Sequence, residues 1–283
     1  MSGVFVPCPE WRRWCGAGLC CVLLPLAGAA EPAGDGTTEA WQLMANQLPR
    51  DAYARLGNIR GAPSREQALA AAVVAVDYQP VTPDRLQEAE QAFATLAQGD
   101  DEVADAAAYM QARLFQVHFQ SPDYVRAAAL YRALADRHPD SHWAQLGLVK
   151  LGLLLLYTLP EPAAPAERIA AATALLARIH DEKLQRDLHL QLAHAGTFYE
   201  QPLDGVLAHL KEVDRIGGLV GQVPEDLAIM LGELSLRAGH YAEARSYFEA
   251  YLRDFVPNLR SVTVRRRLED LAALEAKAKG GRP

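Results

Sequence analysis

Apolar and small residues recur at helical spacing along most of the chain. The clearest case is the stretch 231–257, where two short amphipathic patterns are joined by a turn at Gly239. Gly232 and Ala244 are small where two helices would have to approach each other closely. The residues that would fill the seam between the helices are aromatic: Tyr241, Tyr247, Phe248 and Tyr251. The pattern predicts a pair of antiparallel helices.

Similar patterns predict helices elsewhere, and no recurrent alternation predicts a sheet. Two short helical pieces are expected on either side of Pro49. Ser64 with Gln67 forms a capping box, and Thr82 followed by Pro83 starts a further helix. Ser121-Pro122 is expected to cap the helix that contains Tyr131. Later helices are predicted over 143–157, 166–179, 182–199, 203–216 and 262–278, the last begun by Ser261.

A small residue followed by a bulky one recurs in the second helix of each predicted pair. The bulky residues are spaced by 38, 45, 34 and 38 positions. Periods of this length are typical of stacked helical hairpins, each of which needs a neighbour to bury its apolar face. The small and bulky pairs are Ala89/Phe93, Ala127/Tyr131, Ala172/Leu176, Val206/Leu210 and Ala244/Phe248.

The stretch 228–257 resembles a tetratricopeptide repeat (TPR). The residues that carry the resemblance are Leu231, Gly232, Gly239, Tyr241, Ala244, Phe248, Tyr251 and Pro257. Tyr251 is bulky where the family usually has alanine, and Pro257 stands one residue late. The stretch 107–141 is similar to the repeats of envelope proteins in the same family, through Tyr124, Ala127, Tyr131 and Pro139. The resemblance implies an all-α fold, a right-handed superhelix (α-solenoid) of TPR-like antiparallel helix pairs, whose usual role is binding.

The resemblance also implies a concave face, lined by the first helix of each pair, where a partner would bind. Long polar side chains there could hold a peptide backbone, and aromatic side chains would supply apolar area. The alternative is that the charged residues are solvated and the aromatic residues pack between repeats. The positions on this face are Tyr109, Gln116, Phe119, Trp143, Lys150, Gln191, Phe198, Glu233 and Arg237.

The first 30 residues have the pattern of a secretory signal. Arg12 and Arg13 precede an apolar run, and small residues follow, with cleavage expected about Ala29/Ala30. The run is short for a bilayer span, so no stable membrane span is expected in the mature chain; a retained anchor or a lipidated cysteine is the alternative. The protein is therefore expected to be periplasmic or secreted. The predicted organisation is a signal peptide at 1–30, a flexible spacer at 31–38, and a TPR-like solenoid at 39–279, divided into N-terminal helices (39–99), repeats (102–257) and a capping helix (262–278).

Composition and charge exclude several classes of function. All four cysteines lie within the first 21 residues, so a cleaved chain can form no disulfide and use no thiol in catalysis. The net charge is −7, and Arg265–Arg267 is the one basic cluster, so no nucleic-acid partner is expected.

The sequence predicts no catalytic residue, no metal site and no cofactor. Pro139 interrupts the spacing of His138 and His142, which disfavours a zinc pair. His118 and His194 are expected to be satisfied core residues. The sequence therefore favours a non-catalytic scaffold that binds another protein or peptide of the cell envelope. Two alternatives stay open: a self-assembling structural element, and a wall carbohydrate-binding protein or enzyme, for which the candidate carboxylates are Glu182, Asp187 and Glu200.

Overall fold

The computed structural model describes residues 36–58 and 61–280, and their regular structure is entirely helical, without a strand. The prediction of an all-helical chain is confirmed. The chain forms two compact units, Met1–Leu130 and Tyr131–Pro283, called unit one and unit two below and described separately. The predicted signal at 1–30 lies outside the described residues. So do 31–35 of the predicted spacer, and the first described helix begins at Thr37, two residues before the expected start.

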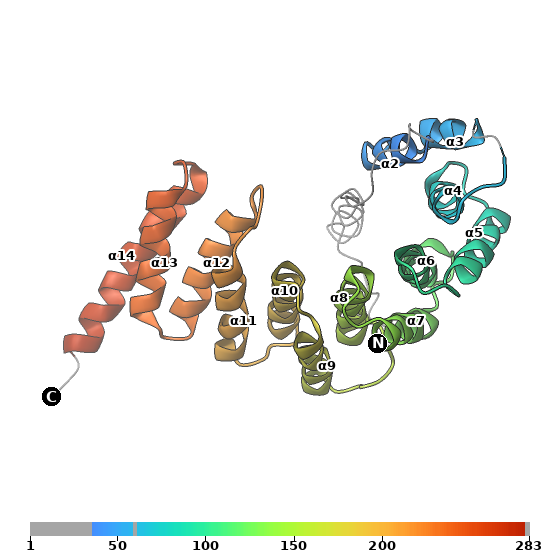
Figure 1. Cartoon of the computed structure of the whole chain (residues 1–283). Coiled ribbons are helices and arrows are strands. Elements are labelled where there is room, and N and C mark those ends of the chain that lie inside the picture. The colour runs from blue at the N-terminus through green and yellow to red at the C-terminus, as the bar shows by residue number, and fades with distance from the viewer. Residues whose placement is uncertain (1–35, 59–60, 281–283) are drawn as a thin grey trace, which may run out of the picture. The chain divides into compact units, whose positions relative to one another are not determined.

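Unit one consists of short helices, each packed against its neighbours (Figure 1). Pro49 occupies the first position of the second helix, where its missing N–H costs no hydrogen bond, and this confirms the predicted break. The helices are α2 (Thr37–Ala45), α3 (Pro49–Gly57), α4 (Arg65–Asp77), α5 (Pro83–Leu96), α6 (Glu102–Arg113), the π-helix η1 (Leu114–His118) and the beginning of α7 (Tyr124–Arg137).

Side-chain caps fix where these helices begin. The Gln67 backbone N–H donates to Ser64 Oγ at 3.2 Å and the Gln67 side chain accepts from the Ser64 N–H at 2.9 Å, so the predicted capping box is confirmed. Thr82 accepts from the backbone N–H of Arg85, as expected. The prediction for α7 is wrong in detail. Its cap is Asp123, which accepts from the Arg126 N–H at 2.9 Å, and not Ser121-Pro122.

The π-helix η1 was not predicted. It closes with a hydrogen bond from the Phe119 N–H to the Leu114 carbonyl at 3.2 Å, and Asp123 N–H donates to the Phe115 carbonyl at 2.9 Å. A π-turn of this kind widens the helix by one residue and shifts the register of the side chains that follow.

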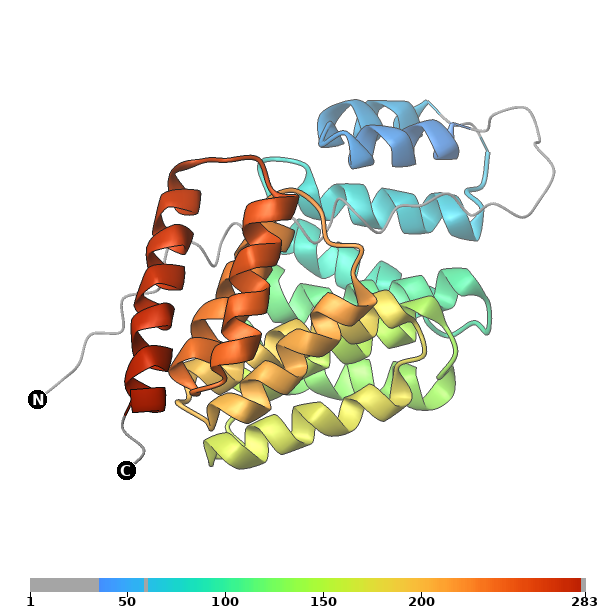
Figure 2. The same ribbon diagram turned by 90° about the vertical axis from the view of Figure 1, so that its left-hand side faces the viewer.

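Unit two continues with longer helices, and α12, α13 and α14 lie side by side in both views (Figures 1 and 2). The leucines of α8 are mostly buried, among them Leu148, Leu151 and Leu154. Among the described helices, none combines the length and the hydropathy that crossing a bilayer requires. The helices are α8 (His142–Tyr157), α9 (Pro165–Thr173), the 3-10 helix η2 (Ala174–Arg178), α10 (Glu182–Phe198), α11 (Leu203–Ile216), α12 (Val223–Arg237), α13 (Tyr241–Asp254) and α14 (Leu259–Gly280).

Glycines permit the closest helix contacts within the pairs α10–α11 and α12–α13. A Cβ atom on Gly232 would lie 2.4 Å from the Phe248 ring, and one on Gly196 would lie 2.8 Å from Val206. Phe248 is fully buried, and so is Tyr131. The close approach predicted for the pair at 231–257 is therefore present, and adjacent antiparallel pairs of this kind are compatible with a helical repeat.

The last helix begins earlier than the sequence suggests. The sequence predicts that Ser261 starts a helix at 262, but α14 begins at Leu259. Asn258 is the capping residue, since its Oδ1 accepts from the backbone N–H groups of Arg260 at 2.8 Å and Ser261 at 3.3 Å. Ser261 is buried, and its hydroxyl accepts from the Asn258 N–H at 3.1 Å.

Candidate functional site

Three of the residues predicted for the concave face belong to unit one. Tyr109 and Gln116 are buried, and burial raises the pKa of Tyr109 to about 12. Gln116 accepts a hydrogen bond from Arg113 at 2.8 Å, and the Phe119 ring centroid lies 5.2 Å from that of Phe115. These side chains have neighbours within unit one.

The other six predicted residues belong to unit two, where they differ in exposure. Trp143, Lys150 and Gln191 are half-buried, and Arg237 is exposed. Glu233 is half-buried and accepts a hydrogen bond from Arg267 of α14 at 2.7 Å, so the terminal helix already engages it. Phe198 stands apart, because 64% of its surface is exposed.

Phe198 belongs to a group of three rings, called the aromatic cluster below. It comprises Tyr157 at the end of α8, Phe198 at the end of α10, and Tyr199. The ring centroids of Phe198 lie 5.8 Å from Tyr157 and 4.9 Å from Tyr199, in edge-to-face geometry. Tyr199 donates a hydrogen bond to the Leu156 carbonyl at 2.6 Å, which holds its ring in place. The result is a fixed aromatic surface with one strongly exposed member.

A pocket, called the α13 pocket below, opens among α11, α12 and α13. It has a volume of about 380 Å³. Its lining includes two carboxylates, Asp214 and Asp254, and three aromatic side chains, Tyr247, Tyr251 and Phe255. Partial burial raises the pKa of the Asp214 carboxyl and also that of the Tyr247 hydroxyl. Volume and lining are of the kind that small ligands or single side chains occupy.

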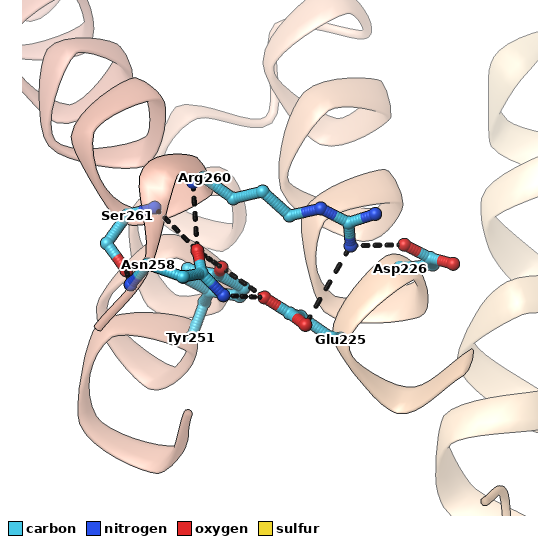
Figure 3. Close-up of polar contacts among 6 residues, drawn as sticks. All are labelled: Glu225, Asp226, Tyr251, Asn258, Arg260 and Ser261. Carbon is cyan, nitrogen blue, oxygen red and sulfur yellow. Dashed lines mark hydrogen bonds and ion pairs between the residues drawn. The ribbon is translucent and has the colours of Figure 1, made fainter. Parts of the chain in front are cut away.

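A network of hydrogen bonds, called the clasp below, joins Tyr251 of the pocket lining to residues of α12 and to the start of α14 (Figure 3). Glu225 accepts from the Tyr251 hydroxyl and from the Asn258 side-chain amide, both at 2.6 Å. These bonds lower the pKa of Glu225. Arg260 reaches from α14 to Asp226 in the first turn of α12. The clasp thereby joins α12, α13 and α14.

Two histidines face each other between α10 and α11. The Nδ1 atoms of His189 and His209 lie 2.9 Å apart, so one of them donates and the other accepts a hydrogen bond. Burial lowers the pKa of both imidazoles, and each is half-buried. Glu212 raises the pKa of His189 and Arg215 lowers it, but burial has the larger effect. The pair is therefore neutral near pH 7.

His118 differs from the expectation of a satisfied core residue. Its Nε2 is buried and has no hydrogen-bond partner among the described residues. Burial, with a smaller contribution from Arg113, lowers its pKa to about 4. The imidazole is thus neutral at ordinary pH, because burial disfavours its charged form.

The structure does not bring the three candidate carboxylates together. Asp187 accepts two hydrogen bonds from Arg186, at 2.7 and 3.0 Å. Glu182 is the first residue of α10, and Glu200 follows its end, so the helix separates them by roughly 25 Å at 1.5 Å per residue. The carboxyl pair of a glycosidase spans less than about 10 Å. Within the described residues, no group of three or more His, Cys, Asp or Glu side chains could hold a metal ion.

Sequence reasoning found Phe198 but missed the other members of the aromatic cluster and the acidic residues of the α13 pocket. Asp214 and Asp254 are 40 positions apart, and no local pattern relates them.

Comparison of the chain with protein-family models, curated proteins and solved structures found no match.

Proposed function

We propose that this protein is a non-catalytic scaffold of TPR-like helix pairs that binds another protein of the cell envelope. In this proposal the pairs continue as a right-handed superhelix, and the leader at 1–30 directs the chain to the periplasm or out of the cell. The adjacent antiparallel pairs and the Gly232–Phe248 contact support the repeat interpretation.

The observation that carries the proposal is the exposure of Phe198 within the aromatic cluster. A phenylalanine that leaves 64% of its surface in water loses the free energy that its burial would provide. Tyr157 and Tyr199 hold it in a fixed orientation, so a partner that covers it has little side-chain entropy to remove. Rigid aromatic residues of this kind are frequent binding hot spots.

Site-specific photo-crosslinking in cells tests the proposal. A photoreactive phenylalanine analogue at position 198 is expected to yield one defined protein adduct. The same analogue in place of Glu249, an exposed residue of α13, is the control and should not yield that adduct. A pattern that is identical at the two positions, or no adduct at either, would contradict binding through the aromatic cluster.

A carbohydrate-binding function is the second candidate, because the same cluster could stack on a sugar ring. Phe198, the exposed member of the cluster, is the ring on which a sugar would stack. Retention of the protein on purified cell-wall polysaccharide, lost in Phe198→Ala, would favour this candidate over a protein partner.

A further inference from the structure

The α13 pocket has a charge pattern suited to a cation. The Asp214 carboxylate forms no hydrogen bond or ion pair with any described residue. Asp254 lies on the same lining but is engaged by Arg253, which donates two hydrogen bonds at 2.8 and 2.9 Å. Asp214 is therefore the carboxylate with unused capacity for a cationic partner.

The helix ends around the pocket reinforce this charge. Asp214 stands in the last turn of α11, and Asp254 is the last residue of α13, so the negative ends of two helix dipoles point toward the pocket. The positive end of α12 is also near, but its first turn carries Glu225 and Asp226. Both of these acids are engaged by the clasp, and they offset the charge of that helix end.

The walls are suited to a planar group. Tyr247 and Phe255 present aromatic surface, and the Tyr251 ring is held because its hydroxyl donates to Glu225. A guanidinium group stacks on aromatic faces and also forms two parallel hydrogen bonds with a carboxylate. An ammonium group is attracted to aromatic rings but is not planar and cannot form the two parallel hydrogen bonds. An arginine side chain therefore matches the lining best.

Two exposed apolar side chains are next in sequence to lining residues of the pocket. Val220 follows the lining residue Leu219 and is 78% exposed, and Val256 follows Phe255 and is 83% exposed. A free cation would leave these side chains uncovered. A polypeptide with apolar residues beside its arginine would cover them and gain hydrophobic free energy.

We propose that the α13 pocket binds an arginine side chain of a partner polypeptide, with the guanidinium at Asp214 and apolar neighbours of the arginine against Val220 and Val256. This site is separate from the aromatic cluster, although it rests on the proposed function in requiring a protein partner.

Peptide binding to the full chain tests the proposal. The probe is a fluorescent five-residue peptide with a central arginine between two valines, and the comparison peptide contains citrulline, the neutral isostere of arginine. Fluorescence anisotropy is expected to show at least about tenfold tighter binding of the arginine peptide, because only arginine forms charge-assisted hydrogen bonds with the Asp214 carboxylate. Equal affinity for the two peptides would overturn the proposal.

Two variants locate the binding. Asp214→Asn removes the carboxylate with little change of shape and should weaken binding of the arginine peptide by about tenfold. Glu249→Gln removes one negative charge from an exposed position of α13 and should leave the affinity within about twofold, since exposed charges at a distance are screened by salt. Equal weakening by both variants would mean general electrostatic attraction and would overturn the assignment to the pocket.

Two further measurements separate the possible failures. Arginine amide alone should bind at least about tenfold more weakly than the peptide, because it leaves Val220 and Val256 uncovered; equal affinity would overturn the requirement for a polypeptide. The photo-crosslinking experiment at position 198 supplies the second measurement. A defined protein adduct there, together with equal affinity for the arginine and citrulline peptides, would reject the pocket proposal and leave the proposed function standing. Thermal melts of Asp214→Asn confirm that the variant is folded before its affinity is interpreted.

Discussion

At the scale of single residues, helix packing in unit two depends on glycines at positions where a larger residue would clash with the neighbouring helix. Gly232 lies against Phe248, and Gly196 lies against Val206. The first contact could be predicted from the sequence, because an aromatic residue and a turn glycine stand at the spacing of a helical hairpin. The second could not, since Val206 is ordinary in any helix and only the fold shows what lies opposite it.

Substitution of Gly232 tests this packing. Gly232→Ala places a Cβ atom 2.4 Å from the Phe248 ring, so the ring or the helix must move. We expect the free energy of unfolding to fall by about 1–3 kcal/mol, the usual cost of overpacking. Urea denaturation followed by circular dichroism measures the change.

The matched control is Gly205→Ala in α11. A Cβ atom there meets nothing within 4 Å, so the gain in helix propensity should stabilise the chain by roughly 0.5–1 kcal/mol. Two variants of similar stability would show that the Gly232 contact is not tight in solution.

At the scale of elements, most helices could be predicted from the sequence, but only some of the residues at which they begin could be. Ser64 and Thr82 are caps that the sequence identifies, while Asp123 and Asn258 take over at two places where serine was expected to begin the helix. Serine, aspartate and asparagine all cap helices well, so the backbone geometry decides which of several neighbouring residues becomes the cap. The π-turn in η1 has no signature in the amino-acid composition of the stretch.

The clasp should hold α14 against α13. Tyr251→Phe removes the hydroxyl, which lies 2.6 Å from Glu225 of α12 and 3.2 Å from Oδ1 of Asn258, the cap of α14, and the ring remains. We expect a loss of about 1–3 kcal/mol in stability, because a hydrogen bond to a charged carboxylate is removed. Hydrogen exchange should accelerate in α14 first. Tyr241→Phe at the opposite end of α13 is the control; an equal effect of the two variants would show that the clasp does not hold α14.

The histidine pair makes the α10–α11 contact sensitive to acid. Each folded-state pKa is lowered below about 6.5, the value in the unfolded chain, so the unfolded state binds more protons below that pH. The stability of the pair is therefore complete above about pH 6.5 and is lost as the pH falls toward the lowered pKa values. A doubly protonated pair would also place two donors face to face at 2.9 Å.

Melting temperatures between pH 7.5 and pH 5 test this prediction. We expect His209→Gln to reduce the loss of stability on acidification, because one of the two lowered pKa values is removed. His142→Gln changes an exposed histidine and serves as the control. Parallel curves for all three proteins would exclude the pair as a source of acid sensitivity.

At the scale of the whole molecule, contacts within each unit join helices that are near in sequence. Among the described helices of a unit, the pairs in substantial contact are at most three elements apart. Stability in such an array is a sum of local terms and contacts between neighbours, so a defect should remain local. The binding surfaces could not be predicted in the same way, because their residues are far apart in the sequence. Asp214 and Asp254 line one pocket, and the rings of Tyr157 and Phe198 come into contact, only after the helices have stacked.

Leu271→Ala tests whether the chain behaves as such an array. Leu271 is fully buried against the core of α13, so its truncation should cost about 2–5 kcal/mol. Hydrogen exchange followed by mass spectrometry should show faster exchange in α13 and α14, a smaller effect in α12, and none in α8. Leu188→Ala, an equally buried leucine of α10, should instead affect α8, α10 and α11. If either variant accelerated exchange uniformly through unit two, the unit would be a single cooperative core, and the repeat interpretation on which the proposed scaffold depends would fail.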